Sequence, residues 1–488
     1  MTVTRRAFLA SVCAAGLAAG LPRPIRAQPE GSVLQMPPLL DATSSGAFDL
    51  VAQDAETAFI GRTASATWGF NNQTFLGPTL RLAANRAVAA SVTNHLTEPF
   101  ALHWHGLLVP GYADGGPHMP IEPKKKWSIE LDINQPPATI WYHSHTHLHT
   151  ANHVQKGLAG VIQLSDGRDD ERGLPTEYGI DDLTLVIQDR RFDRRGKMVY
   201  DPGMHDEMMG FTGDVILVNG QVGAKAVVPR GIVRLRLLNG SNARVYDLAS
   251  RAGRLLHLVA TDAGFLDRPT TIEVLRLAPG ERAEVLIDFT DGTNDVLVSG
   301  PNPNVGMMGG GMMGGGMMGR TQKAGFDILP IEVGSTHATR IERLPESLDG
   351  VMPDLVALGA FRRDITLDMG MGGMMRRRDK RHSINGQSFD MDKLNFSVQR
   401  GVTEIWTIEG QMMAHPLHIH GVVFQVLSEN GGPVSPRNRG WKDTVLVDGR
   451  VEIAVQFDQP ASADKPFMFH CHILEHEDGG MMGQFAVV

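Results

Sequence analysis

Cysteine is nearly absent from this chain, whose 488 residues include only Cys13 and Cys471. Cys13 lies in an N-terminal segment that we expect to be removed, so no disulfide bond within the chain is expected in the mature protein. The remaining thiol, Cys471, would be a liability in an oxidising compartment unless something held it. A bound metal ion would hold it.

An excess of positive charge and long apolar runs are also lacking. Charged residues make up 20% of the chain and the net charge is −8, so the composition does not suggest nucleic-acid binding. After the N-terminal segment, no stretch is long and apolar enough to span a bilayer. A chain of this length, with 42% hydrophobic residues, predicts a soluble protein of roughly two to four domains.

The first residues are predicted to direct export. Arg5 and Arg6 precede an apolar run that ends near Gly20, and Ala27 is a small residue at a suitable cleavage point. This pattern is typical of a twin-arginine signal peptide, here residues 1–27. We therefore expect a periplasmic protein without a membrane anchor. The alternative, an uncleaved anchor helix, is disfavoured because the apolar run is short.

Helical periodicity is rare, and short alternating runs broken by Gly, Pro, Asn and Asp predominate, which predicts a protein made mostly of β-sandwiches. The strands expected are Arg81–Val92, Leu183–Gln188, Val215–Val218, Ile232–Leu238, Ala283–Phe289, Thr403–Ile408, Thr444–Val447 and Val451–Phe457.

A weak internal repeat occurs three times, and each copy follows an expected strand. The copies run from Asn94 to His103-Trp104-His105-Gly106, from Asn239 to Tyr246-Asp247-Leu248, and from Glu409 to His415-Pro416-Leu417-His418-Ile419-His420-Gly421. Three copies indicate three similar domains, with polar connectors at 165–182 and 334–350. Because the middle copy lacks histidine, we expect the second domain to carry no metal and to serve as a spacer and packing partner.

Histidine is concentrated in four clusters, two toward each end of the chain. They are His103-Trp104-His105, His143-Ser144-His145, His415 with His418 and His420, and His470-Cys471-His472 with His476. In a strand, alternate residues share a face, so His470 and His472 should point one way and Cys471 the other. Such a tripeptide can bind metals on both sides of a sheet and join them by a short covalent path. Thiolate, imidazole and the thioether of Met481 form the donor set of a blue-copper site.

The motifs HWHG, WYHSH, HPLHIHG and HCHILEHEDGGMM stand in the order of three-domain bacterial multicopper oxidases, which the chain resembles over roughly residues 40–488. It resembles the periplasmic cuprous oxidases of copper tolerance most. The resemblance implies an all-β fold of three cupredoxin-like Greek-key β-sandwich domains, placed at 39–165, 180–335 and 350–488. It also implies four copper ions, one type 1, one type 2 and a type 3 pair.

The resemblance assigns a ligand set to these ions. The type 1 copper would be held by His415, Cys471 and His476, with Met481 as a weak axial ligand, and the type 2 copper by His103 and His418. The type 3 pair would be held by His105, His143, His145, His420, His470 and His472. The trinuclear group would lie between the first and third domains, since the ligand clusters lie at opposite ends of the chain.

Two carboxylates match the family's acidic proton-delivery positions. Asp114 follows His105, and Glu477 directly follows His476. The alternatives are an ordinary turn aspartate and a solvated glutamate.

The remaining histidines are considered separately. His147, His149 and His153 continue the alternation after His145 and would extend a copper-capture surface, although such residues are more often solvated or hydrogen-bonded within a loop. The isolated histidines are expected to be structural, and they are His118, His205, His257, His337 and His382.

Methionine-glycine segments indicate the reducing substrate. The first carries Met307, Met308, Met312, Met313, Met317 and Met318, and the second carries Met369, Met371, Met374 and Met375. So much glycine predicts flexible loops rather than a helix or strand. Thioethers favour Cu(I), so we expect the first segment to recruit this ion and the second to lie closer to the type 1 site. The alternative is an insertion without a ligand role.

Residues just before His415 also bear on the substrate. On a strand, Met413 would share the face of His415 and could pass on an electron. In the cuprous oxidases a carboxylate stands four residues before that histidine, and here the residue is Gln411. Asp364 or Asp368 would have to supply the missing charge.

The expected activity is therefore oxidation of Cu(I) by O2, catalysed by a monomer. A laccase-type oxidase of phenols or other metal ions uses the same ligands and stays open as an alternative. A copper nitrite reductase shares the fold but lacks the paired histidine motifs of a trinuclear site. A copper-sequestering or cell-division scaffold is expected only if ligands are missing, and none is missing.

Overall fold

The computed structural model describes residues 31–300, 325–334, 341–355, 359–370 and 381–488. The expected signal peptide at 1–27, the methionines at 307–318, Met371, Met374, Met375 and His337 lie outside the described residues. Over the described ranges, helices are too short or too polar to cross a membrane.

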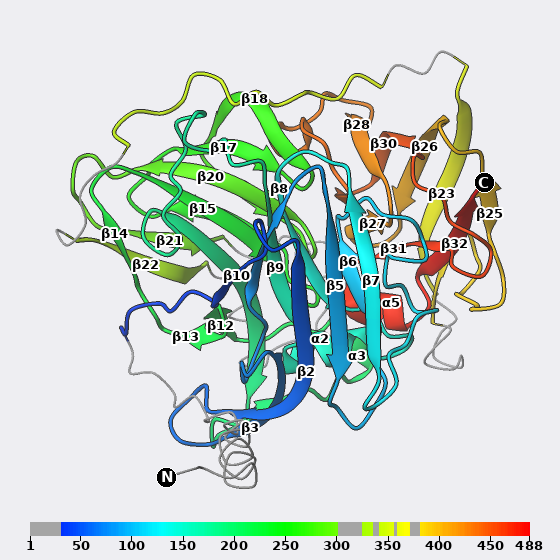
Figure 1. The fold of residues 1–488 in the computed structure, drawn as a ribbon, viewed down its shortest axis with the longest axis horizontal. Helices are drawn as coiled ribbons and strands as arrows, with labels where there is room; N and C mark the ends of the chain where they lie inside the picture. Colours follow the sequence, from blue (N-terminus) through cyan, green and yellow to red (C-terminus); the bar gives the residue numbers. More distant parts are fainter. Residues whose placement is uncertain (1–30, 301–324, 335–340, 356–358, 371–380) are drawn as a thin grey trace, which may run out of the picture.

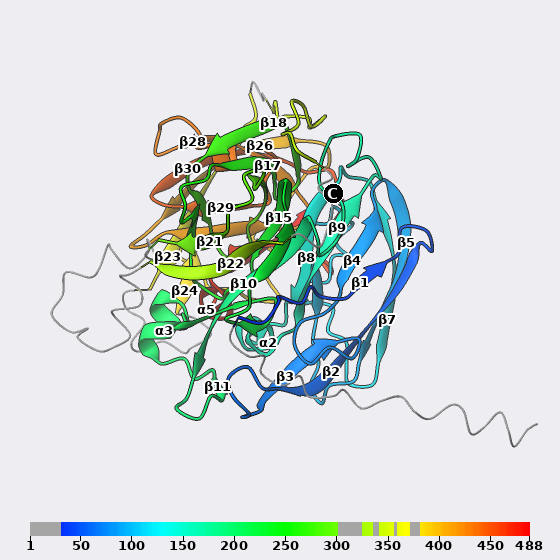
Figure 2. The same ribbon diagram turned by 90° about the vertical axis from the view of Figure 1, so that its left-hand side faces the viewer.

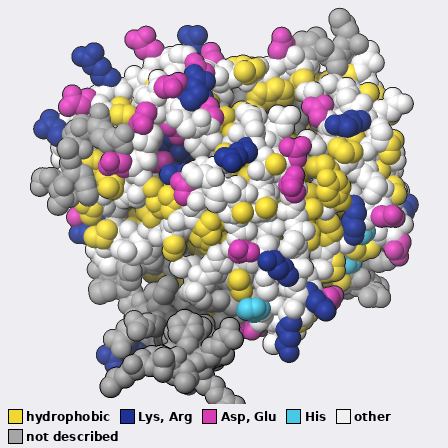
Figure 3. Space-filling view, viewed as in Figure 1, with side chains coloured by type: hydrophobic (Ala, Val, Ile, Leu, Met, Phe, Trp, Pro, Cys, Tyr) yellow, Lys and Arg dark blue, Asp and Glu magenta, His cyan; other side chains and the backbone are white. Residues whose placement is uncertain are grey.

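The predicted all-β fold of three cupredoxin-like domains is confirmed. In Figure 1 the first domain, blue to cyan, stands between the second, green, and the third, orange to red. Figure 2 shows the same three units from the side of the second domain. On the face drawn in Figure 3, Lys and Arg are scattered among Asp and Glu, and only a few histidine atoms reach the surface.

The first domain consists of two packed sheets and a short helix. Its elements are β1 (Leu39–Asp41), β2 (Ala47–Thr57), β3 (Ser65–Phe70), β4 (Thr79–Ala83), β5 (Arg86–Asn94), β6 (Leu102–His105), β7 (Lys126–Ile133), β8 (Ala138–Ser144), α2 (Thr150–Lys156) and β9 (Ala159–Ser165). The sheet β1-β4-β9-β8-β6 packs on β3-β2-β5-β7 through one hydrophobic core. The single strand expected at Arg81–Val92 is wrong, because a turn at Asn85 (φ 56°) sends the chain from one sheet to the other.

The second domain is the largest in strand number and follows the same plan. Its elements are β10 (Asp182–Phe192), β11 (Met198–Val199), α3 (Met204–Met209), β12 (Val215–Val218), β13 (Gln221–Val222), β14 (Ala226–Pro229), β15 (Ile232–Asn239), β16 (Tyr246–Ser250), β17 (Leu256–Thr261), β18 (Gly264–Ile272), β19 (Leu275–Leu277), β20 (Arg282–Asp288), β21 (Asp295–Ser299) and β22 (Phe326–Gly334). The sheet β13-β12-β10-β15-β20-β17-β18 packs on β14-β22-β21-β16-β19.

The third domain again pairs two sheets. Its elements are β23 (Phe361–Met369), β24 (His382–Ile384), β25 (Phe396–Val398), β26 (Thr403–Gly410), β27 (His415–Ile419), β28 (Val423–Glu429), η4 (Pro436–Asn438), β29 (Thr444–Val447), β30 (Arg450–Gln456), β31 (Phe467–Cys471), α5 (Leu474–Asp478) and β32 (Met482–Val487). The sheet β24-β23-β26-β30-β28 packs on β25-β32-β31-β27-β29.

A helix contact ties the first domain to the third beside the histidine clusters. The carboxylate of Asp478, at the end of α5, accepts hydrogen bonds from the backbone N–H groups of Thr150 and Ala151 at 3.1 and 3.0 Å. These N–H groups begin α2, where they have no partner within the helix. At this junction, a side chain from the C-terminal part of the protein therefore accepts the hydrogen bonds of the first N–H groups of α2.

Candidate metal centre

Strand alternation decides on which side of the sheet each donor lies. On β27, Leu417 and Ile419 face the hydrophobic core, and so does Cys471 on the neighbouring strand β31. The intervening residues His418 and His470 are register partners on the opposite face. The same pattern occurs in the first domain, where Trp104 packs into the core against Phe48 with ring centroids 5.8 Å apart. Its flanking histidines therefore point out of that domain.

A mononuclear pocket forms on the core side of β31. The Sγ atom of Cys471 lies 3.6 Å from Nδ1 of His415 and 3.7 Å from Nδ1 of His476. Met481 is fully buried. Its backbone lies beside both residues, because its carbonyl accepts from the N–H of Cys471 at 3.0 Å and its N–H donates to the carbonyl of His476 at 2.9 Å. One thiol and two imidazoles thus meet in one place, and Met481 lies in the same buried cluster as Cys471.

The protonation of this pocket is set by burial. Burial lowers the pKa of His415 to about 4 and holds that of His476 well below its usual range, so both rings are neutral. Their Nε2–H groups donate to the backbone carbonyls of Gln411 (3.1 Å) and Met208 (3.0 Å), which leaves each Nδ1 lone pair aimed at the sulfur. Burial raises the pKa of the Cys471 thiol, so a thiolate here requires a cation.

A second, larger pocket lies between the first and third domains. It is formed by eight buried imidazoles, four from each domain, which are His103, His105, His143, His145, His418, His420, His470 and His472. Strand pairing sets their register, since His103 is opposite His143 on β6 and β8. Close approaches join the two domains, as between His103 and His418, whose Nε2 atoms are 3.4 Å apart.

The hydrogen bonds of these rings test whether the pocket suits a metal. The Nδ1 atoms of His103 and His418 lie 3.0 and 2.9 Å from the backbone carbonyls of Asp114 and Asp443. A carbonyl only accepts, so each Nδ1 carries the proton and each Nε2 presents a lone pair. Two lone pairs 3.4 Å apart repel each other unless a cation lies beside them. The donor set therefore fits metal binding.

The same argument holds for the rest of the pocket. The Nε2 atom of His470 lies 3.2 Å from the Nε2 atoms of both His145 and His420. These three histidines form one compact group of possible ligand atoms. The rings of His105, His143 and His472 form another, with centroids 5.1 to 5.6 Å apart. The arrangement thus contains two triads and the His103–His418 pair.

Both predicted acidic residues contact this pocket. The Oδ2 atom of Asp114 accepts from Nδ1 of His420 at 2.8 Å, and its Oδ1 atom is buried without a hydrogen-bond partner among the described residues. The Oε2 atom of Glu477 lies 3.2 Å from Nδ1 of His470, and its Oε1 atom lies 3.6 Å from Nδ1 of His145. Asp114 and Glu477 are 1% and 3% exposed, so neither is a solvated surface carboxylate.

Sequence reasoning missed a buried charge pair that supports the pocket. Asp443 lies 3.2 Å from Nε2 of His105, and Nη1 of Arg282, on β20 of the second domain, donates to it at 2.8 Å. Burial opposes the negative charge on Asp443, but Arg282 outweighs it and holds the pKa of Asp443 well below its usual range. Arg282 also donates to the carbonyl of Thr139 in the first domain at 3.2 Å. The second domain therefore supports the ligands directly and is more than a spacer.

The glycine of the HWHG motif serves this same contact. Gly106 has φ +91°, and a Cβ atom there would lie 2.6 Å from Nη2 of Arg282 and 2.8 Å from Oδ2 of Asp443. Only glycine accepts both the backbone conformation and the close approach.

We expect Arg282→Met to destabilise the metal-free protein by about 3–5 kcal/mol, because it leaves Asp443 buried without its cation. Denaturant titration of the metal-free variant against wild type measures the change. The matched control is Arg268→Met, since Arg268 is exposed and pairs only with its neighbour Asp267 among the described residues. Equal stability of the two variants would show that the Arg282 pair has no such role.

The other predicted site residues have different surroundings. Met369 and Met413 are 4% and 5% exposed and lie in the same hydrophobic cluster as Cys471. Met413 does not sit on a strand, because β27 begins at His415 and Met412 has φ 67° in the turn before it. Gln411 is exposed there and contributes its carbonyl to His415.

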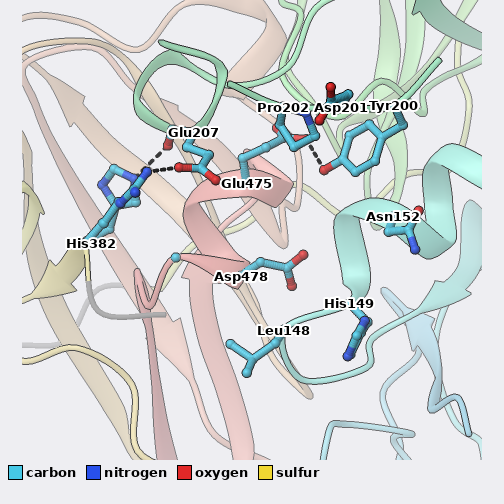
Figure 4. Close-up of a pocket in the computed structure, with 12 residues that line it drawn as sticks. Leu148, His149, Asn152, Tyr200, Asp201, Pro202, Glu207, His382, Glu475 and Asp478 are labelled. Carbon is cyan, nitrogen blue, oxygen red and sulfur yellow. Dashed lines mark hydrogen bonds and ion pairs between the residues drawn. The ribbon is translucent and has the colours of Figure 1, made fainter. Parts of the chain in front are cut away.

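A cavity of about 640 Å³ lies beside the mononuclear pocket (Figure 4). His382 lines it, and the His382 ring centroid is 4.4 Å from that of His476. The Nε2–H group of His382 also donates to the carbonyl of Glu207, 2.9 Å away. The prediction of a purely structural His382 therefore overlooked a contact with a candidate ligand, and an isolated histidine in the sequence gave no signal for it.

Cupredoxin-like domains that bring a thiol and imidazoles together in this way define a class of copper-binding proteins. Family models described as multicopper oxidase match residues 51–169, 181–299 and 361–488. The chain belongs to the multicopper oxidase family, which confirms the resemblance at the level of the family.

Similar proteins carry two kinds of name. The cell division protein FtsP of Yersinia pestis is 38% identical over all of this chain and 99% of its own length, and that of Escherichia coli K12 is 36% identical over the same shares. Among solved structures, a laccase-like multicopper oxidase CueO from Ochrobactrum sp. is 39% identical (TM-score 0.85, 93% of this chain and 100% of that chain). McoA of Aquifex aeolicus is 30% identical (TM-score 0.81, 94% and 100%).

Proposed function

We propose that this protein is a periplasmic cuprous oxidase that couples oxidation of Cu(I) to Cu(II) to reduction of O2 to water. Each O2 takes up four electrons and four protons and yields two water molecules, so four Cu(I) ions are oxidised per turnover. Bound copper ions of the types expected from the sequence would supply the one-electron steps that this requires. The physiological result would be removal of the more toxic cuprous ion.

One observation carries the proposal: a single tripeptide contributes to both pockets. Cys471 belongs to the mononuclear pocket, and its neighbours His470 and His472 belong to the larger one. The Cys471 backbone therefore gives an electron accepted at the first pocket a covalent route of a few bonds to the second. His415, His476 and Met481 would complete the first pocket as ligands. The eight imidazoles of the interdomain pocket would hold the other ions.

Proton supply falls to residues at the interdomain pocket. Asp114 has a buried oxygen without a partner among the described residues and also contacts His420. Glu477 contacts His145 and His470 on the other side. In this proposal both carboxylates pass protons toward the imidazoles as O2 is reduced.

The cavity beside the mononuclear pocket favours a cationic substrate. Asp201, Glu207, Glu475 and Asp478 line it (Figure 4). The carbonyl of Met208, next to Glu207, accepts from Nε2–H of the candidate ligand His476. Arg381 also lines the cavity and pairs with Glu207, and burial raises the pKa of Asp478 well above its usual range. The charge that attracts a metal cation here therefore comes from Asp201 and from Glu475, whose pKa burial raises to about 7, and it gives no advantage to a neutral phenol.

The methionine segment supplies the second reason for a cuprous substrate. Thioether sulfur binds Cu(I) in preference to harder ions. We expect deletion of residues 306–319 to lower O2 uptake with limiting Cu(I) severalfold and to leave the rate with a methoxyphenol unchanged or higher. Steady-state O2 uptake by both proteins with both substrates measures this. The segment has no recruiting role if Cu(I) turnover at low copper is equal in the two proteins.

A cell-division role is the second candidate, and the full-length similarity to proteins named FtsP favours it. One variant, Cys471→Ser, distinguishes the two candidate functions. A structural role in division would survive Cys471→Ser in a strain that depends on this protein, whereas a role that requires oxidase chemistry would not.

A further inference from the structure

A third group of donor atoms lies in the first domain, apart from both pockets. Glu98, in the loop between β5 and β6, meets His149 and His153, and one ligand atom from each lies within 4.8 Å of the others. His149 immediately precedes α2 and His153 lies one turn later, so both imidazoles project from the same side of the helix. Their ring centroids are 5.6 Å apart.

His153 is buried and held in place by its neighbours. It is 1% exposed, its ring packs 4.9 Å from that of Trp68, and its Nδ1 atom lies 2.8 Å from Oγ of Ser144. Within the described part of the chain its Nε2 atom has no hydrogen-bond partner, and Oε2 of Glu98 is 4.0 Å away. A buried polar atom left without a partner is destabilising, and a bound cation would remove that cost. Burial also lowers the pKa of His153 to about 3, so the ring is a neutral ligand.

The other two donors leave the group open to solvent. His149 is exposed and also lines the cavity of Figure 4, and the side chain of Glu98 is 38% exposed. The ammonium group of Lys156 lies 3.6 Å from Oε1 of Glu98 and 3.8 Å from the ring centre of Trp68. Lys156 therefore compensates the Glu98 charge when no ion is bound and would compete with an ion that binds.

We propose that Glu98, His149 and His153 form a binding site for a divalent transition-metal ion, separate from the copper pockets. Two imidazoles and a carboxylate suit Zn(II) and Cu(II), and the affinity for Cu(II) should be higher. The site differs from the copper pockets because it combines two imidazoles with a carboxylate and lies open to solvent. The proposal is independent of the reducing substrate.

Zinc is the probe that tests this site, because it has no redox chemistry and can be added to the copper-loaded protein. Equilibrium dialysis followed by elemental analysis gives zinc bound per chain. We expect wild type to bind one zinc ion that His149→Ala and Glu98→Gln bind at least about tenfold more weakly, and Lys156→Met to bind it more tightly. His149 and Glu98 reach solvent, so these variants are expected to fold.

Matched controls are His257→Ala on β17 and Glu130→Gln on β7, both outside the group. They should bind zinc as wild type does. The proposal is overturned if wild type binds no additional zinc, or if the His149 and Glu98 variants retain as much zinc as their controls.

Discussion

Cys471→Ser should lose both the blue colour of the copper-loaded protein and its O2 uptake. The absorption expected at roughly 600 nm comes from a thiolate bound to copper, and Cys471 is the only cysteine among the described residues. A serine hydroxyl is a poor ligand for this site. The variant also lacks the sulfur atom from which the covalent route between the two pockets begins. Absorption spectra and oxygen-electrode traces of the two proteins measure both losses.

Copper content separates loss of the mononuclear site from loss of the fold. The variant should keep the copper of the interdomain pocket, because no side-chain atom of Cys471 belongs to that pocket. A variant that remains blue, or that consumes O2 at the wild-type rate, contradicts the assignment of Cys471.

The parts of the site that could be predicted from the sequence depend on local periodicity. Alternation along a strand places Cys471 opposite His470 and His472. In the structure Cys471 and His470 lie on opposite faces of β31, which ends at Cys471, and His472 follows the strand and lies near His143 of the interdomain pocket. The strand expected at Val215–Val218 coincides with β12. Such features can be predicted from residues that are close together in the sequence. The family motifs then indicate which histidine clusters come together in the fold.

Contacts between distant segments could not be predicted in this way. Arg282 and Asp443 are separated by 161 positions, and nothing in the composition near either residue indicates that they pair. The carbonyl of Met208 that accepts from His476 is even more distant, 268 positions from its partner. Every residue has a backbone carbonyl, so the residue type does not indicate which carbonyl accepts this hydrogen bond. Spatial neighbours of this kind appear only when three domains pack around one centre.

Asp114→Asn should keep the blue colour and the copper content but lower O2 uptake by about 10²–10⁴-fold, the range typical of a lost proton-transfer group. Asparagine has nearly the shape of aspartate, and its amide oxygen can still accept from Nδ1 of His420, as Oδ2 of Asp114 does at 2.8 Å. The variant lacks the negative charge and cannot take up a proton. It therefore separates proton delivery from ligand positioning.

The control for this substitution is Asp132→Asn, an exposed aspartate on β7 of the same domain, which should leave the rate unchanged. Asp114 lies in an Ala-Asp-Gly-Gly turn, and asparagine is well tolerated in turns. A purely conformational role therefore predicts that Asp114→Asn consumes O2 as fast as wild type. That result would contradict the proton-delivery role, whereas a slow but blue and fully loaded variant supports it, because only the charge and the exchangeable proton have been removed.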